Sequence, residues 1–150
     1  MNFTINADLP ATPERLWVLF FDVQRVAALI PGCENVREIT PLESYAAVMK
    51  QKIGPFKLEM PTDIKVEEHT APSRVRMRAS GRDKFTGTTL EVLLTVGLAA
   101  LPDGGARLAV DADMQVNGRL ASLGYSVVKK KSEELFIEFE RRLRAELETV

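Results

Sequence analysis

The chain has 150 residues, of which 45% are hydrophobic and 27% charged. This size suits one domain with a substantial core, so we expect residues 1–150 to form a single domain. Twenty basic and 21 acidic residues leave a net charge of −1, so the chain has no overall positive field to attract nucleic acid, and we expect no nucleic-acid partner. One cysteine, Cys33, excludes an intrachain disulfide and a zinc site built from several thiolates.

The first ten residues, MNFTINADLP, lack the basic segment and the continuous apolar segment of a secretory signal. No apolar run in the sequence approaches the ~20 residues that cross a bilayer as a helix. We therefore expect a cytoplasmic protein whose contact with a membrane is peripheral.

Alternating apolar and polar residues predict a first strand over residues 2–9. Thr12 before Pro13 predicts the start of a short helix, and Asp22 is expected to cap a second short helix. Segments with a period of two then predict six more strands, separated by turns that contain glycine or proline: 35–40, 45–53, 56–67, 74–80, 86–101 and 106–116.

From about Arg119 the period changes to that of a helix. Its apolar stripe consists of Leu120, Leu123, Val127, Leu135, Phe139, Leu143 and Leu147. A helix from this point to the end of the chain is on the order of 45 Å long, at 1.5 Å per residue. The order of elements predicts an α+β helix-grip fold, in which a seven-stranded curved antiparallel sheet wraps around a long C-terminal helix, with two short helices between the first two strands.

One face of this sheet and the facing helix stripe carry almost no polar atoms. The residues are Phe56, Leu58, Met60, Met77, Leu90, Val92, Leu94 and Met114 on strands, and Leu123, Val127, Leu135 and Phe139 on the helix. A filled core would also need such a face. Because an unbranched thioether can repack around different ligands, the methionines favour an apolar ligand-binding cavity, for which ~300 to 1,000 Å³ is usual.

Few residues suit catalysis. His69 is the only histidine and lies beside a predicted turn, so we expect it to be solvated and to hold no metal. Cys33 has no basic partner in the sequence that would lower its pKa, which favours a structural thiol. We expect no catalytic residue and no covalently bound cofactor. A cyclase- or hydrolase-like enzyme with inward polar groups, such as Tyr45, stays open as an alternative, as does a cavity-free protein-interaction module.

A lysine run, Lys129, Lys130 and Lys131, lies in the predicted C-terminal helix. Such a run is most often a solvated face. It also suits contact with a protein partner or with anionic lipid headgroups, where each lysine contributes about 1 kcal/mol. A second basic row falls on the outer face of the predicted sheet: Arg74, Arg76 and Arg78.

Three short motifs narrow the interpretation: Ile30-Pro31-Gly32-Cys33-Glu34, Ile53-Gly54-Pro55, and the segment from Asn117 to Gly124. Together with the order of elements, they resemble the CoxG family, the G subunit of carbon monoxide dehydrogenase, within the SRPBCC, START-like helix-grip superfamily. The resemblance spans essentially the full chain. In one departure, residues 82–87 are more charged than the stretch of small residues typical of the family at this place.

This resemblance implies a non-catalytic accessory protein with an apolar small-molecule ligand, a quinone or isoprenoid. It further implies that the protein assists a molybdenum-containing oxidoreductase, such as carbon monoxide dehydrogenase, at the cytoplasmic face of the inner membrane. The lysine run would then orient the protein there. We expect the cavity entrance to be formed by Pro31, Gly32, Cys33, Gly54, Pro55 and Gly124.

Overall fold

The structure is a computed structural model that describes residues 2–148. Its elements are, in chain order, β1 (Asn2–Leu9), α1 (Pro13–Phe21), α2 (Val23–Leu29), β2 (Cys33–Thr40), β3 (Ser44–Ile53), β4 (Phe56–Thr70), β5 (Arg74–Arg82), β6 (Thr89–Ala100), β7 (Ala106–Asn117), the 3₁₀ turn η1 (Arg119–Leu123) and α3 (Tyr125–Glu148). The predicted α+β class and the predicted order of elements are confirmed.

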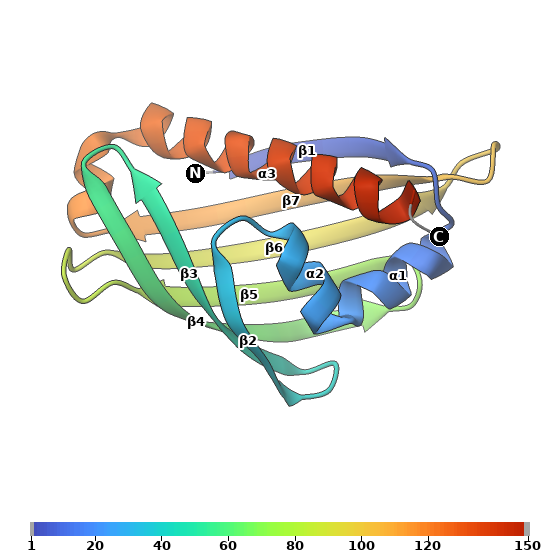
Figure 1. Cartoon of the computed structure of the whole chain (residues 1–150), viewed down its shortest axis with the longest axis horizontal. Coiled ribbons are helices and arrows are strands. Elements are labelled where there is room, and N and C mark those ends of the chain that lie inside the picture. Colours follow the sequence, from blue (N-terminus) through green and yellow to red (C-terminus); the bar gives the residue numbers. More distant parts are fainter. Residues whose placement is uncertain (1, 149–150) are drawn as a thin grey trace.

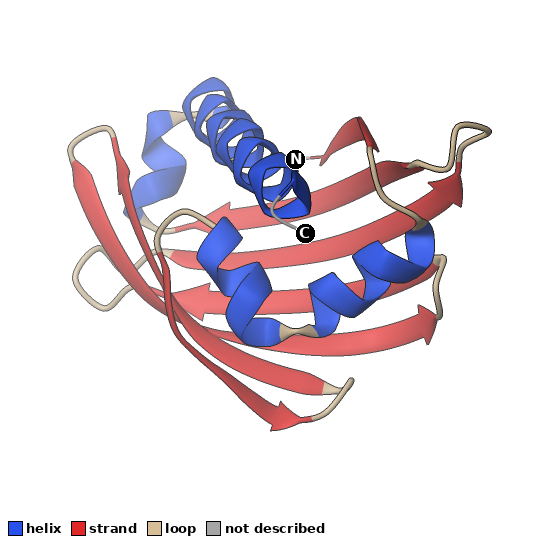
Figure 2. Ribbon diagram, turned by 45° about the vertical axis from the view of Figure 1, so that its right-hand side comes forward, coloured by secondary structure: helices blue, strands red, loops and turns tan. Residues whose placement is uncertain are grey.

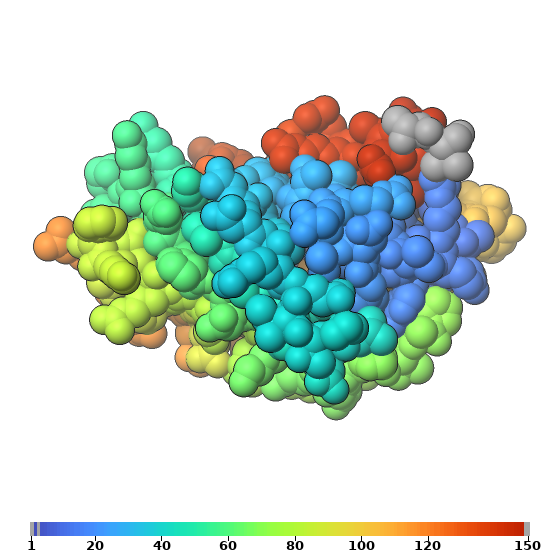
Figure 3. Space-filling model, turned by 60° about the horizontal axis from the view of Figure 1, so that its bottom comes forward, coloured from blue at the N-terminus to red at the C-terminus, as the bar shows by residue number. Residues whose placement is uncertain are grey.

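The seven strands form one antiparallel sheet in the order β1-β7-β6-β5-β4-β3-β2. Consecutive strands are neighbours from β2 to β7, and β1 crosses over to pair with β7, where Leu9 lies opposite Ala106. The sheet curves, and all three α-helices lie on its concave side (Figures 1 and 2). The space-filling view shows the blue and cyan residues of α1, α2 and β2 covering the centre of one side of the molecule (Figure 3).

The short helices begin as the sequence predicts, with one difference. Thr12 caps α1, because its Oγ1 accepts a hydrogen bond of 3.2 Å from the backbone N–H of Arg15. Asp22 occupies the cap position of α2, but its side chain makes no capping hydrogen bond to that helix. A helix of seven residues is therefore held chiefly by packing against its neighbours.

The C-terminal helix begins later than predicted. Gly118 and Gly124 have φ angles of 89° and 91°, and the left-handed region that favours glycine ends the 3₁₀ turn before α3 starts. The helix has 24 residues, which makes it about 36 Å long. The interruption also changes which side chains face inward: Val128 is 4% exposed, whereas Val127, expected in the cavity, is 39% exposed. The expectation for Val127 was wrong.

Strand ends differ from the prediction by a few residues. The chain from Asp83 to Thr88 forms a loop rather than the start of β6, because the Asp83 side chain binds backbone N–H groups within the loop. β4 extends to Thr70 and β5 to Arg82, so the hairpins are longer than the alternation indicates.

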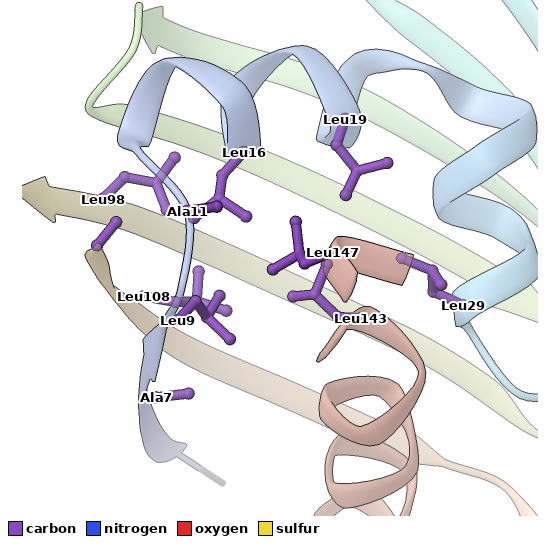
Figure 4. Close-up of a cluster of buried hydrophobic side chains, with 11 residues drawn as sticks. Ala7, Leu9, Ala11, Leu16, Leu19, Leu29, Leu98, Leu108, Leu143 and Leu147 are labelled. Atoms are coloured by element: carbon purple, nitrogen blue, oxygen red, sulfur yellow. The ribbon is translucent and has the colours of Figure 1, made fainter. Parts of the chain in front are cut away.

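Two clusters of buried apolar side chains hold the helices to the concave face. The first joins β1, α1 and the end of α3 to β6 and β7 (Figure 4); its buried members are Ala7, Leu9, Ala11, Leu16, Leu19, Leu29, Leu98, Ala106, Leu108, Leu143 and Leu147. The second lies toward η1 and consists of Ile53, Leu58, Met60, Leu120 and Val128. Each fully buried leucine contributes roughly 1.5 to 3 kcal/mol to stability.

Candidate functional site

Between the two clusters, the concave face is apolar but not fully buried. Cross-strand pairing places Ile64 opposite Ala79, Ala79 opposite Val92, and Met77 opposite Leu94. All five side chains are partly buried and belong to neither cluster. Since residues two apart along a strand share a face, they lie on the same side as Leu98, a member of the first cluster. We call Ile64, Met77, Ala79, Val92 and Leu94 the central strip.

Apart from Val127, the residues expected to line a cavity fall into three groups. Leu58 and Met60 are buried in the second cluster, and others pack against a cluster from outside: Phe56, Leu90, Met114 and Leu123 against the second, Phe139 against the first. Met77, Val92, Leu94 and Leu135 are partly buried and belong to neither cluster. The structure therefore places much of the expected lining in packed core and leaves the middle of the concave face less covered.

A pocket of about 380 Å³ lies between the end of β7 and the first turn of α3. Its walls include Met114 and Val116 on the strand, and Gly124, Tyr125 and Val128 at the start of the helix. This volume is within the range of small-molecule sites. Two of the expected site residues, Met114 and Gly124, contribute to it.

A second pocket, of about 500 Å³, involves β2, β3 and β4. The register of β2 against β3 is irregular between Glu34 and Arg37, and the pocket lies along this irregular stretch, where Val36 and Ala46 are among its walls. The period of two in the sequence did not indicate this pocket, because a bulge in one strand leaves the average alternation almost unchanged.

Three of the expected entrance residues, Pro31, Gly32 and Cys33, lie close to β3. The carbonyl of Pro31 accepts a hydrogen bond of 2.6 Å from Gln51, and a Cβ at Gly32 would clash with the carbonyl oxygen of Lys50. Cys33 follows them as the first residue of β2. This motif fixes the chain closely against β3.

The turn between β3 and β4 lies beside η1. A Cβ built on Gly54 would be 3.3 Å from a methyl group of Leu123, so the turn packs on the segment that precedes α3. Pro55 and Gly124 are both exposed at this end of the sheet. The turn and η1 therefore lie against each other.

The side chains considered for catalysis do not form an acid–base arrangement. His69 is exposed on β4. Tyr45 is buried, its hydroxyl accepts a hydrogen bond of 3.1 Å from the backbone N–H of Leu42, and burial raises its pKa. Burial, with a smaller effect from the charge of Glu34, raises the pKa of the Cys33 thiol, so Cys33 is a protonated thiol at neutral pH. Within residues 2–148, no three His, Cys, Asp or Glu side chains are grouped so as to bind a metal ion.

The basic residues noted in the sequence differ in their partners. Lys129 lies 3.9 Å from a carboxylate oxygen of Glu133 and 5.9 Å from the ring centre of Tyr125. Lys130 is exposed and Lys131 is partly buried. The arginine row is less positive than its sequence indicates, because carboxylates neutralise it: Arg76 and Arg78 pair with Glu67, and Arg78 also pairs with Glu91. No helix in the described part of the chain is long and apolar enough to cross a membrane.

The family model of CoxG, described as the G subunit of carbon monoxide dehydrogenase, matches residues 6–148. Among solved structures, a conserved protein from Geobacillus kaustophilus is similar over 97% of this chain and 94% of its own, with a TM-score of 0.89 and 19% identity. A protein from Rhizobium loti has a TM-score of 0.73 and 20% identity over 97% and 96% of the two chains. A protein from Thermus thermophilus has a TM-score of 0.72 and 13% identity over 97% and 95%. These likenesses confirm the helix-grip fold. No curated protein matches the chain.

Proposed function

The chain belongs to the CoxG family of carbon monoxide dehydrogenase, and we propose that it is a non-catalytic accessory protein that carries a lipid-like molecule, a quinone or an isoprenoid. The family description is that of a dehydrogenase subunit, which agrees with an accessory role. In this proposal the partner is a molybdenum hydroxylase such as carbon monoxide dehydrogenase, and the protein acts at the cytoplasmic face of the inner membrane.

The observation that carries the proposal is the central strip. It consists of apolar side chains on the covered, concave face, and yet each of them keeps some exposure to solvent. A ligand that removed 100 Å² of this apolar surface from water would gain about 2.5 kcal/mol before the cost of ordering is subtracted. A long apolar molecule is the chemistry that such a strip recognises, because the strip offers no polar group to orient a charged one.

The pocket beside α3 supplies a route for the ligand. Met114 lines the pocket and also lies opposite Val92, a member of the central strip. A ligand entering past Tyr125 would therefore reach the strip by continuing along β6 and β7. In this proposal the entrance for the ligand is bordered by Pro31, Gly32, Cys33, Gly54, Pro55 and Gly124.

Two leucines that are neighbours in the sequence provide the test. Leu94 lies on the concave face, whereas the adjacent Leu93 points to the convex face, opposite Arg78 and Asp113. We expect Leu94→Trp to fill the central strip and weaken binding of a short-chain ubiquinone, measured by fluorescence quenching in detergent, about tenfold. The matched variant Leu93→Trp should bind as the parent protein does.

Native mass spectrometry of the protein purified from its host should in addition show a co-purifying lipid-type molecule. If no such molecule is found and neither tryptophan variant changes quinone binding, the carrier proposal is wrong. The concave face would then be a filled core, and the protein would act through its outer surfaces.

A further inference from the structure

One end of the molecule is formed by three segments that lie together: the β3–β4 turn, the loop of residues 83–88 and η1. Leu120 donates its backbone N–H to Thr88 Oγ1 at 3.3 Å, Gly87 and Gly118 approach each other closely, and Gly54 packs on Leu123. Figure 1 shows all three segments at the same end of the sheet. We call this end the tip.

A buried carboxylate gives the loop of the tip a fixed shape. Asp83 is fully buried; its Oδ1 accepts hydrogen bonds from the backbone N–H groups of Phe85 at 2.8 Å and Thr86 at 3.1 Å, and its Oδ2 accepts one from the backbone N–H of Glu59 at 2.8 Å. Burial acts to raise the pKa of Asp83, but these hydrogen bonds outweigh it and leave the pKa below its ordinary value. The loop is thus held by an ionised side chain.

This loop presents an aromatic side chain to solvent. Phe85 is 85% exposed, more than any other large hydrophobic residue described. Tyr125 and Val127, at the start of α3 beyond η1, are 50% and 39% exposed. The yellow-green residues of the loop project at the left end in Figure 3. A single exposed ring is common on soluble proteins, so what distinguishes this one is its place on a fixed loop that is accompanied by unpaired basic side chains.

Basic residues are concentrated on the segments of the tip and beside them. The five at the tip are Lys52 and Lys57 on the β3–β4 hairpin, Arg82 and Lys84 beside Phe85, and Arg119 at the start of η1. They are exposed, and none of them forms an ion pair among residues 2–148. Lys52 lies directly opposite Lys57, a like-charged pair that destabilises the hairpin. Of the two acidic residues in the hydrogen bond that joins the loop to β4, Asp83 is buried and Glu59 is exposed.

We propose that the tip docks on the surface of an anionic lipid bilayer, with Phe85 inserted between the headgroups and the five basic side chains against the lipid phosphates. This inference deepens the proposed function and rests on it for the identity of the ligand that would be exchanged there. The pocket between β7 and α3 adjoins η1 through Ala121, so the docked orientation would open it toward the bilayer.

The chemistry of the tip favours a membrane over a protein partner. An exposed aromatic residue on a loop, with lysine and arginine on the same and neighbouring segments, matches the interfacial region of a bilayer, where rings insert and cations meet phosphates. An aromatic anchor in a protein interface instead lies within a patch of about 800 Å² on each partner that offers further apolar contacts.

Sedimentation of the full chain with vesicles tests the inference. Binding is expected to vesicles of phosphatidylcholine that contain phosphatidylglycerol, to be much weaker with phosphatidylcholine alone, and to decrease as salt is raised. Phe85→Ala should lower the partition coefficient about tenfold or more. The double variant Lys57→Gln, Lys84→Gln should lower it about 25-fold, since each basic residue contributes about fivefold.

Matched controls lie elsewhere on the surface. Ile137 is 69% exposed on α3, and Lys65 and Arg74 are exposed basic residues on β4 and β5 that form no ion pair within the described chain. Ile137→Ala and the double variant Lys65→Gln, Arg74→Gln should therefore bind vesicles as the parent protein does. Inorganic phosphate should compete no better than chloride at equal ionic strength, because a free anion does not take up the phenyl ring.

The inference is overturned if the parent protein does not bind the anionic vesicles, or if the tip variants and the controls behave alike. It is also overturned if Phe85→Ala abolishes association with the oxidoreductase while no vesicle binding occurs, since the tip would then be a protein contact. Quinone binding in detergent, measured on the same variants, separates the two proposals. Loss of vesicle binding with unchanged quinone binding supports the tip, and vesicle binding without quinone binding rejects only the carrier function.

Discussion

Leucine-to-alanine substitutions at two positions on the concave side measure how completely that side is filled. Leu143 is 0% exposed in the first cluster (Figure 4), whereas Leu94 is partly buried in the central strip. Leu143→Ala removes buried apolar atoms and leaves a cavity that its packed neighbours cannot close, which costs about 3 to 5 kcal/mol. Leu94→Ala loses only part of a transfer free energy, about 1 to 2 kcal/mol, because part of its side chain is already exposed to solvent.

Urea denaturation of lipid-free protein gives both free energies of unfolding. Trp17, the only tryptophan, packs against the first cluster and reports on it by fluorescence, while circular dichroism reports on the whole sheet. Coincident transitions and an unchanged urea dependence would show that the two variants unfold in one step, as the comparison requires.

The expected result is a difference of about 2 kcal/mol between the two variants. If Leu94→Ala destabilises the protein as much as Leu143→Ala does, the middle of the concave face is filled and the central strip is ordinary core. Adding a bound quinone should raise the stability of the parent protein, because a ligand that binds only the folded state stabilises it.

Three further predictions concern local features. Thr12→Ala should lower stability by about 1 kcal/mol in thermal unfolding, since it removes the cap of α1. Gly118→Ala should be much more destabilising than Gly104→Ala, because both glycines have positive φ but only at Gly118 would the new methyl group clash with neighbouring backbone; equal effects would contradict this. Hydrogen bonds from Arg141 and Arg142 lower the pKa of Glu138 from 4.5 to about 2. The stabilisation from ionised Glu138 should thus be complete above pH 4.5 and be lost as the pH falls toward 2. The difference in unfolding free energy between the parent protein and Glu138→Gln should therefore shrink over this range, and a constant difference would refute the prediction.

The strands and their order could be predicted because the alternation of side chains is unusually regular. In β6 and β7, Leu90, Val92 and Leu94 lie opposite Val116, Met114 and Ala112. The residues between them along each strand point to the other face of the sheet. A period of two fixes which face a residue occupies. It carries no information on how far a helix covers that face, and therefore the sequence could assign Leu58 and Leu94 to the same side but not their different burial.

The start of the C-terminal helix shows the limit of a periodicity argument. The stripe from Leu120 to Leu147 is continuous in the sequence, yet Gly124 adopts a positive φ and resets the helical phase. Val128 then takes the inward position that was expected for Val127. A glycine in an apolar helical pattern is compatible with either a continued or a broken helix, and packing against the sheet decides between them.

The loop of residues 83–88 was visible in the sequence only as an unusual concentration of charge. Asp83 looks like a solvated residue by composition, but its carboxylate is the buried acceptor for three backbone N–H groups. Hydrophobic patterning cannot detect such a role, because it scores a carboxylate as polar wherever it lies. The consequence, an exposed Phe85 on a well-bonded loop, could be seen only in three dimensions.

The two clusters and the tip together favour the proposed ligand carrier over a protein whose concave face serves only as a core. Covering the central strip would add roughly 1 kcal/mol for each partly exposed side chain that became buried. The first cluster already ties α1, α2 and the end of α3 to the sheet without the strip. The exposed Phe85 and the basic side chains of the tip lie at the opposite end from that cluster, where η1 and the pocket also lie. A packed end that holds the helices to the sheet, and a basic end with an exposed aromatic ring and an adjoining pocket, fit the proposed transfer of a ligand from a bilayer.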